Sequence, residues 1–371
     1  MKILYFANTD WYLYNFRLNL ARAMRDRGNE VVLMSPPGEY GERLNAEGFR
    51  WISFPLSRKG TNPLVELGTL KRLTEVYERE KPDLVHHFTV KCVTYGSLAA
   101  KRAGVPYIIN AITGLGHVFV GNTLSIRLLR FVVSGLYKRA MGGTKVIFQN
   151  PDDLNLFLKM GLVNEEQSVL IRGSGIDIER FAPMPEPETN TPLVVLPARM
   201  LWNKGVGEFV KAAHILYDQG VHARFALVGV ADSGNPAAVS LIQLGEWQKE
   251  CVVEWWGWQE DIKVVFAMAH IVCLPSYREG VPRVLAEAAA CTRALVTTDV
   301  PGCREIVRDG ENGLLVPVRD APALAGALKK LIEDPALRRR MGLKGREFVE
   351  EEFSNKRVVT GTLDVYDRLT A

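Results

Sequence analysis

The sequence predicts an α/β protein made of two doubly wound domains. Its opening alternates an apolar segment at residues 2–7, an amphipathic segment at 14–27 and a second apolar segment at 30–34. That is the β-α-β pattern of a parallel sheet. A Pro-rich polar segment at 182–192 interrupts the chain, and the same pattern restarts at residue 193. With 371 residues, the chain is long enough for two such domains.

The composition is that of an ordinary globular protein. Apolar residues make up 47% and charged residues 24%, and the net charge of +4 permits contact with anionic lipid or a diphosphate without requiring either. The five cysteines show no metal-ligand spacing, so we expect reduced thiols and a cytosolic setting. The apolar part of the N-terminal segment is too short for a signal peptide, and no run reaches about 18 apolar residues. We therefore expect this protein to meet a membrane from one side only.

The loop after the first predicted strand lacks the glycine-rich turn of a dinucleotide site. Residues 8–12 read Asn-Thr-Asp-Trp-Tyr. A bulky polar loop at the carboxyl end of a strand can instead face a second substrate. Asn15 and Arg17 begin the helix that follows, so we expect both to contact that substrate, with Arg17 binding a phosphate. A solvated helix arginine explains Arg17 equally well.

A second loop of the first domain carries two glycines after the strand predicted at 106–110. It reads Ala-Ile-Thr-Gly-Leu-Gly-His from residue 111, and glycine lets a ligand approach the backbone closely. Thr113, Gly114 and His117 are the candidate contacts. A catalytic role for His117 stays open, but we favour contact with the ligand.

A strongly apolar helix with interspersed basic residues is predicted at 124–139. Such a helix can lie in the lipid interface with its cations on head groups. A core helix that exposes its basic residues is the commoner alternative. We favour membrane contact, because it would present a lipid-linked ligand beside the 110–117 loop. The candidate contacts are Arg127, Arg130, Phe131, Lys138 and Arg139.

The second domain begins with a strand at 193–197 and a cationic loop. Arg199 and Lys204 place a fixed guanidinium and a flexible ammonium in that loop. Together they can clamp a diphosphate and neutralise a leaving group. Gly229, at the end of the next strand, is predicted to let the backbone approach the same ligand.

Residues 271–290 read as strand, loop and helix, with a carboxylate on each side of the helix start. Pro suits the first helical turn, where backbone N–H groups and the helix dipole can hold a phosphate or a sugar oxygen. Glu279 lies in the loop and Glu287 within the helix, about 12 Å further along. They can hold hydroxyl groups at opposite ends of one extended ligand, although two solvated glutamates at a plain loop-helix junction are the alternative. The residues at the helix start are Gly280, Val281 and Pro282.

This run resembles the signature of the retaining glycosyltransferases of family 4. One departure is Thr292, where that family usually has glycine. The order along the chain is also similar, because the Arg199–Lys204 pair precedes the two glutamates. The matching residues of the run are Pro275, Ser276, Glu279, Gly280, Pro282, Glu287, Ala288, Pro301, Gly302 and Glu305.

The resemblance implies the GT-B fold, in which two Rossmann-like domains face each other across a cleft. Residues 1–181 would form the acceptor-binding domain, 182–192 the linker and 193–355 the domain that binds the nucleotide sugar. The final helix, 356–371, would pack back on the first domain.

The resemblance also implies roles for the candidate residues. Glu279 would contact the donor sugar and Glu287 the ribose. Arg199 and Lys204 would stabilise the leaving diphosphate, so that neither a metal nor a cofactor is needed. Trp258 and Gln259 are placed like the residues of that family that lie near the base.

The phrase from Pro197 to Gly205 and the basic apolar helix resemble family members that extend bacterial polyprenyl-diphosphate sugars. This implies transfer of an N-acetylhexosamine from a UDP-sugar to a lipid-linked saccharide, with retention, in polysaccharide or N-glycan assembly. The partners would be a nucleotide sugar, the lipid-linked acceptor and the inner face of the cell membrane, with no nucleic acid. Two alternatives stay open: a nucleotide-sugar epimerase of the same fold, and a non-catalytic lipid-binding scaffold.

Overall fold

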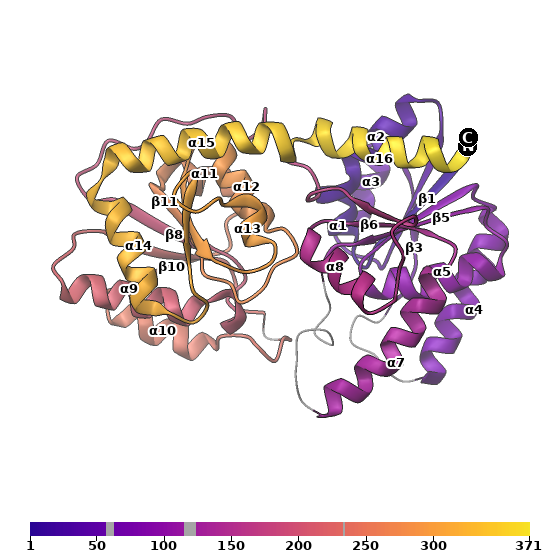
Figure 1. The fold of residues 1–371 in the computed structure, drawn as a ribbon, viewed down its shortest axis with the longest axis horizontal. Helices are drawn as coiled ribbons and strands as arrows, with labels where there is room; N and C mark the ends of the chain where they lie inside the picture. The colour runs from indigo at the N-terminus through magenta and orange to yellow at the C-terminus, as the bar shows by residue number, and fades with distance from the viewer. Residues whose placement is uncertain (57–62, 115–123, 233) are drawn as a thin grey trace. The chain divides into compact units, whose positions relative to one another are not determined.

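The computed structural model describes residues 1–56, 63–114, 124–232 and 234–371, with the backbone alone for 63–64 and 124–132. The chain forms two compact units (Figure 1). One unit comprises Met1–Gly175 with Val358–Ala371, and the other comprises Ile176–Arg357. Within the described residues, no helix is long and apolar enough to cross a membrane.

The first unit is built on a parallel sheet whose described strands run in the order β3-β2-β1-β4-β5-β6-β7. Every neighbouring pair of these strands is parallel. The strands are β1 (Lys2–Phe6), β2 (Glu30–Ser35), β3 (Arg50–Ser53), β4 (Leu84–Phe88), β5 (Tyr107–Ile112), β6 (Lys145–Phe148) and β7 (Ser168–Leu170). The helices are α1 (Asp10–Tyr12), the π-helix η1 (Leu13–Arg17), α2 (Leu18–Asp26), α3 (Gly41–Ala46), α4 (Pro63–Glu80), α5 (Val90–Arg102), α7 (Leu124–Met141) and α8 (Pro151–Lys159).

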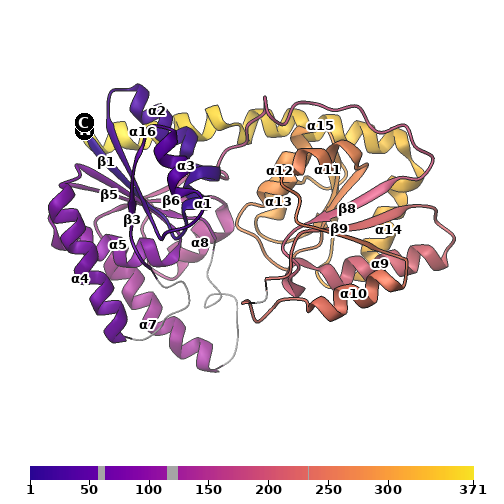
Figure 2. The same cartoon turned by 180° about the vertical axis from the view of Figure 1, so that it is seen from behind.

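Both faces of this sheet are buried, which explains why its strands read as continuous apolar runs. On β1, Ile3 and Tyr5 pack on the face covered by α2 and by the C-terminal helix α16 (Asn355–Thr370). Leu4 and Phe6 pack on the opposite face, in the core that α4 and α5 share. Figure 2 shows α4, α5 and α7 side by side on that second face.

The second unit repeats the plan, with described strands in the order β10-β9-β8-β11-β12-β13, all parallel. The strands are β8 (Leu193–Pro197), β9 (Arg224–Val228), β10 (Glu254–Gly257), β11 (Ile271–Leu274), β12 (Ala294–Thr298) and β13 (Gly313–Val316). The helices are the 3-10 turn η2 (Trp202–Lys204), α9 (Val206–Asp218), α10 (Leu241–Lys249), α11 (Ile262–Met268), α12 (Arg283–Ala290), α13 (Cys303–Ile306), α14 (Ala321–Glu333) and α15 (Pro335–Phe353). Alternate residues of β8 again face two cores, one shared with α9 and α14 and one with α12 and α15.

Each sheet has one point where the strand order reverses. From β1 the chain adds strands toward β3, and from β4 it adds strands toward β7. In the second unit the same reversal separates β8 from β11. Ligands of open α/β sheets bind at the carboxyl ends of the strands beside such a switch point.

The structure divides the chain at Gly175, where we expected the first domain to run to residue 181. Ile176 donates its backbone N–H to Phe353 at 2.8 Å and accepts from Asn355 at 2.8 Å. Phe181 is buried in the core of the second unit. These long-range contacts tie the segment to the second unit, and no local pattern in the sequence marks them.

The Pro-rich segment at 182–192 is packed against the second unit rather than extended away from it. Arg293 donates to the carbonyl oxygens of Met184 and Pro185 at 3.1 and 2.8 Å. Glu186 forms an ion pair with the buried Arg338 at 2.5 Å. The expected linker is therefore part of the second unit.

Candidate active site

The loops that follow β8 and β11 are packed directly on each other. Gly205 has φ +74°, and a Cβ there would lie 2.1 Å from the carbonyl oxygen of Pro275. Tyr277 donates its backbone N–H, and Ser276 its hydroxyl, to the carbonyl oxygen of Asn203 at 3.0 and 3.1 Å. Glycine at position 205 therefore allows two loops distant in sequence to form one surface at the switch point.

An ion pair joins the two loops. The ammonium group of Lys204 donates to the carboxylate of Glu279. The two side chains are only 21% and 13% exposed, so this pair is less screened by solvent than a surface pair. The structure thus brings together two of the three residues predicted to be catalytic.

Gly302 packs closely against the backbone of the Glu279–Gly280 segment. Its φ is +82°, and a Cβ there would lie 2.3 Å from the carbonyl oxygen of Gly280. Glu279 also donates its backbone N–H to Pro301 at 3.3 Å. The segment leads into α12, whose N-cap residue, Pro282, makes no side-chain capping bond to any described residue. The start of α12 therefore presents the positive end of its dipole at the switch point.

Glu287 lies one turn into α12 and is paired within its own helix. Arg283 Nε lies 2.7 Å from Glu287 Oε1 in an ion pair, and the carboxylate side chain is 12% exposed. Burial raises the pKa of Glu287 above its ordinary value, although the positive charge of Arg283 opposes the shift. The i,i+4 spacing of this pair is visible in the sequence, but the role expected for Glu287 did not involve Arg283.

Arg199 lies beside this surface but pairs with a different acid. Its Nη1 donates to Asp232 Oδ2 at 2.9 Å, and the arginine side chain is half exposed. Gly229, with φ +141°, packs on the same loop, because a Cβ there would lie 1.9 Å from the carbonyl oxygen of Ala198. The Trp255 indole donates to the Gly229 carbonyl oxygen at 2.8 Å and fixes this approach.

Trp258 and Gln259 follow the carboxyl end of β10, next to β9 in the sheet. Trp258 is 63% exposed, which is high for a tryptophan. Gln259 donates its side-chain amide to the Trp256 carbonyl oxygen at 3.0 Å. The sheet thus places both residues at the same edge as Arg199 and Lys204.

Three further residues support the Glu279 loop, and sequence reasoning missed their contacts. Tyr277 donates its hydroxyl to Glu208 Oε1 at 2.8 Å, and the Arg319 guanidinium lies 4.6 Å from the centre of its ring. Burial and the neighbouring Glu208 carboxylate raise the pKa of Tyr277. Tyr277 lies within the signature run, but nothing local in the sequence indicates its two partners.

In the first unit, Arg17 is a buried residue. It is 5% exposed, so the solvated alternative is wrong. Its Nη2 donates to the Tyr12 hydroxyl at 2.7 Å, and its guanidinium carbon lies 4.4 Å from the centre of the Phe88 ring. Asn15, two residues earlier in the same π-helix, donates its side-chain amide to the Trp11 carbonyl oxygen at 3.0 Å.

Thr113 and Gly114 follow β5 and are partly exposed, with Gly114 at φ +148°. His117 lies outside the described residues, as do the side chains of Arg127, Arg130 and Phe131. Of the remaining proposed membrane contacts, Lys138 and Arg139 are exposed at the C-terminal end of α7.

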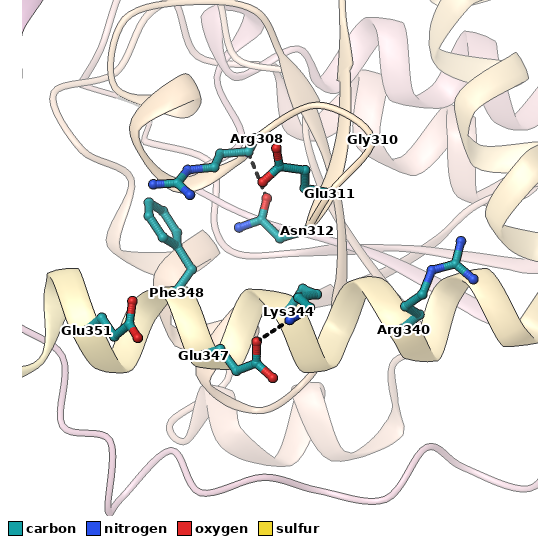
Figure 3. Close-up of a pocket in the computed structure, with 9 residues that line it drawn as sticks. All are labelled: Arg308, Gly310, Glu311, Asn312, Arg340, Lys344, Glu347, Phe348 and Glu351. Atoms are coloured by element: carbon teal, nitrogen blue, oxygen red, sulfur yellow. Dashed lines mark hydrogen bonds and ion pairs between the residues drawn. The ribbon is translucent and has the colours of Figure 1, made fainter.

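A separate surface pocket of about 500 Å³ lies between α15 and the segment that precedes β13 (Figure 3). The Arg308 guanidinium carbon lies 4.2 Å from the centre of the Phe348 ring, and Lys344 pairs with Glu347 at 2.6 Å. Three basic and three acidic side chains line it, so it carries no net charge that would select an anion. It adjoins the amino end of β13, which is the edge of the sheet opposite the two packed loops.

Both units of the chain match models of known glycosyltransferase families. The model described as "Glycosyl transferases group 1" matches residues 191–334, and that described as "Glycosyl transferase 4-like" matches residues 2–150. The N,N'-diacetylbacillosaminyl-diphospho-undecaprenol alpha-1,3-N-acetylgalactosaminyltransferase of Campylobacter jejuni is 31% identical, and the match covers 100% of this chain and 99% of that protein. The chain belongs to the group 1 glycosyltransferases. The expected family relationship is thus confirmed, and the protein is a hexosyltransferase.

Other relatives agree on the fold and the class of enzyme. The UDP-Gal:alpha-D-GlcNAc-diphosphoundecaprenol alpha-1,3-galactosyltransferase of Escherichia coli is 22% identical to this glycosyltransferase, over 78% of this chain and 77% of that protein. The crystal structure of Anabaena HepE in complex with UDP-glucose matches with a TM-score of 0.80 at 21% identity, covering 100% of this chain and 99% of that one. The two Rossmann-like domains of this glycosyltransferase therefore have the GT-B fold.

Proposed function

We propose that this glycosyltransferase moves an N-acetylhexosamine from a UDP-sugar to a polyprenyl-diphosphate-linked saccharide. Binding of the donor is supported by the two loops that pack on each other at the β8/β11 switch point. They place Lys204, Glu279 and the start of α12 on one surface. The acceptor class is supported by the Campylobacter jejuni relative, whose name specifies an undecaprenol-diphosphate sugar and transfer of N-acetylgalactosamine. The structure of HepE holds UDP-glucose, which supports UDP as the carrier.

Each group of the donor has a partner of suitable chemistry in the second unit. Lys204 and Arg199 would bind the diphosphate together with the positive end of the dipole at the start of α12. These groups lower the energy of the charge that develops as the diphosphate leaves. Glu279 would accept hydrogen bonds from the sugar hydroxyls and Glu287 from the ribose.

The nucleotide base of the donor would lie at the carboxyl end of β10. There the exposed Trp258 ring offers a stacking surface, with Gln259 beside it. Gly229 would let the donor approach the neighbouring backbone.

The proposed reaction retains the anomeric configuration and uses neither a metal nor a cofactor. The bond from the anomeric carbon to the diphosphate oxygen breaks, and the acceptor oxygen bonds to the same face of that carbon. The acceptor's proton passes to the departing phosphate oxygen. In this scheme the cations of the second unit take the role that a divalent metal has in other transferases.

The acceptor would bind the first unit, at the carboxyl ends of β1 and β5. Asn15, Thr113 and Gly114 lie in the loops there, and His117 belongs to the same loop of the sequence. Because the acceptor is a membrane lipid, we place the enzyme in the cytoplasm, peripherally bound to the inner face of the cell membrane. The basic α7, with Lys138 and Arg139 exposed, would contribute to that contact.

Thermal stabilisation by nucleotides and nucleotide sugars, with and without EDTA, tests the donor side. A ligand that binds only the folded state must raise the melting temperature by mass action. We expect UDP and one UDP-N-acetylhexosamine to raise it equally in both conditions. Tight binding to liposomes with no response to any nucleotide would support the scaffold, and turnover of a UDP-sugar into its epimer without acceptor would support the epimerase.

A further inference from the structure

The first unit contains a buried positive charge, Arg17, which forms no ion pair with any residue that the structure describes. Within the described part of the chain, the partners of Arg17 are the Tyr12 hydroxyl and the rings of Tyr12 and Phe88, and it forms no ion pair. Burial, together with the charge of Arg17, holds the pKa of His86 well below its ordinary value. A guanidinium that is 5% exposed loses most of its hydration, which is costly unless an anion replaces the water.

The helix that starts next to this charge has no side-chain cap among the described residues. Phe88, under the guanidinium of Arg17, is the last residue of β4, and Thr89 is the N-cap of α5. Thr89 makes no capping bond to the first turn of α5, and its buried hydroxyl lacks a hydrogen-bond partner of normal geometry among the described residues. The backbone of Thr89 has φ +73°, which is strained for a β-branched residue.

These groups occupy the switch point of the first sheet. Arg17 lies in the π-helix that follows β1, and α5 follows β4, the strand hydrogen-bonded to β1. The second unit has the same arrangement, with the cation Lys204 after β8 and the uncapped start of α12 after β11. In each sheet, therefore, a cation and a helix N-terminus flank the point where the strand order reverses.

We propose that Arg17 and the first turn of α5 bind the diphosphate of the lipid-linked acceptor. The proposal rests on the proposed function and names the part of the acceptor that this site holds. The guanidinium would donate to a phosphate oxygen, while backbone N–H groups of the first turn of α5 and the Thr89 hydroxyl would donate to others. Each switch point then binds one diphosphate, the donor's in the second unit and the acceptor's in the first.

Equilibrium binding of farnesyl diphosphate and farnesyl monophosphate to the full-length protein tests this site. Saturating UDP is added, so that the donor site is filled and does not compete. We expect the diphosphate to bind more tightly, and inorganic pyrophosphate to displace it. Arg17→Met should weaken farnesyl diphosphate binding by about tenfold or more, which is the range for a lost hydrogen bond to a charged group.

A matched control is available on the neighbouring helix. Arg25 also lies over a phenylalanine ring, 4.6 Å from the centre of Phe49, but away from the switch point. Arg25→Met should leave farnesyl diphosphate binding unchanged. Thr89→Gly, which relieves the backbone strain, should raise the melting temperature and still weaken the binding.

The outcomes separate this proposal from the proposed function. Unchanged farnesyl diphosphate binding in Arg17→Met, with normal UDP binding, would overturn the acceptor site and leave the donor assignment standing. If wild-type protein did not bind UDP, the proposed function would fail. The same titration without UDP would then still decide whether Arg17 holds a diphosphate.

Discussion

Lys204 and Glu279 form an ion pair although they are 75 residues apart in the sequence. In the proposed mechanism, Lys204 binds the donor diphosphate and Glu279 binds the sugar. The pair therefore holds both side chains near their working positions before the donor arrives. It also means that the diphosphate must compete with Glu279 for the lysine.

Glu279→Gln should consequently have opposite effects on binding and on turnover. UDP, which has no sugar for Glu279 to hold, should bind several-fold more tightly, because the lysine no longer has a competing carboxylate. Even exposed ion pairs are worth up to about 1 kcal/mol. Transfer should fall by about 100-fold or more, because the hydroxyl groups of the donor sugar lose the carboxylate that positions them. Calorimetric titration of UDP and initial rates check the two parts.

Lys204→Ala serves as the comparison for that variant, since it removes the cation instead of its competitor. It should weaken UDP binding and cut turnover severely. Near-native turnover in both Lys204→Ala and Glu279→Ala, at equal donor concentration, would contradict the site assignment.

Gly302→Ala should strongly reduce turnover while the protein remains folded. The new Cβ would lie 2.3 Å from the Gly280 carbonyl oxygen, so the Glu279 loop must shift. A displacement of this size is expected to cost about 100-fold in turnover. Gly310→Ala is the control, since Gly310 has a similar φ of +76° and open space around its Cβ position. A positive φ in the left-handed region costs about 1–2 kcal/mol of stability, and Gly302→Ala should lose more than Gly310→Ala because its ψ of −46° lies outside that region. Only Gly302→Ala should lose activity.

Glu287→Gln should show a pH-dependent gain in stability. Burial raises the pKa of Glu287 above 4.5, its ordinary value. The folded state therefore favours the neutral carboxyl, whose contribution to stability is complete below pH 4.5 and falls as the pH rises through the raised pKa. Glutamine stays neutral, so the variant should melt about 2 °C or more above wild type at pH 8 and close to it at low pH.

The same variant should bind UDP-sugar more weakly, because the proposed contact to the ribose loses its charge. Glu347→Gln, whose carboxylate side chain is 61% exposed, is the control and should change neither property. An equal gain in melting temperature at both pH values would contradict the raised pKa of Glu287 as the cause of the gain.

Trp258→Ala tests the proposed contact with the base. The side chain is 63% exposed, so its removal should change the melting temperature little. Loss of a stacking surface is expected to weaken UDP binding by about tenfold. Tyr217→Ala removes another exposed ring, 68% exposed on α9, and should leave UDP binding unchanged. Equal UDP affinity in all three proteins would remove Trp258 from the donor site.

Local signals in the sequence predicted most of the fold. The apolar run at 271–274 indicated β11, and Pro282 after the polar loop indicated the start of α12, because strand, loop and helix start are each encoded by adjacent residues. The helix expected at 124–139 is α7, Leu124–Met141. The glycines that support the site were harder to interpret, since their purpose depends on a carbonyl oxygen elsewhere in the chain. Gly302 beneath Gly280 is an example.

Pairings across long distances in sequence could not be predicted. Ile176 hydrogen-bonds to Phe353 and Asn355. These contacts set the domain boundary, and no pattern in the residues around Ile176 indicates them. The burial of Arg17 likewise depends on Phe88, a residue of another strand. The composition of the Arg17 helix alone is equally compatible with an exposed side chain.

Transfer itself tests the proposed function more directly than any binding experiment. The reaction would contain purified enzyme, a polyprenyl-diphosphate-linked N-acetylhexosamine and each UDP-sugar in turn, in EDTA, with the product's new linkage identified by NMR. We expect a product extended by one α-linked N-acetylhexosamine from one UDP-sugar, at a rate that EDTA does not change. A β-linked product, a requirement for added metal, or no transfer from any UDP-sugar to a lipid diphosphate acceptor would contradict the proposed function.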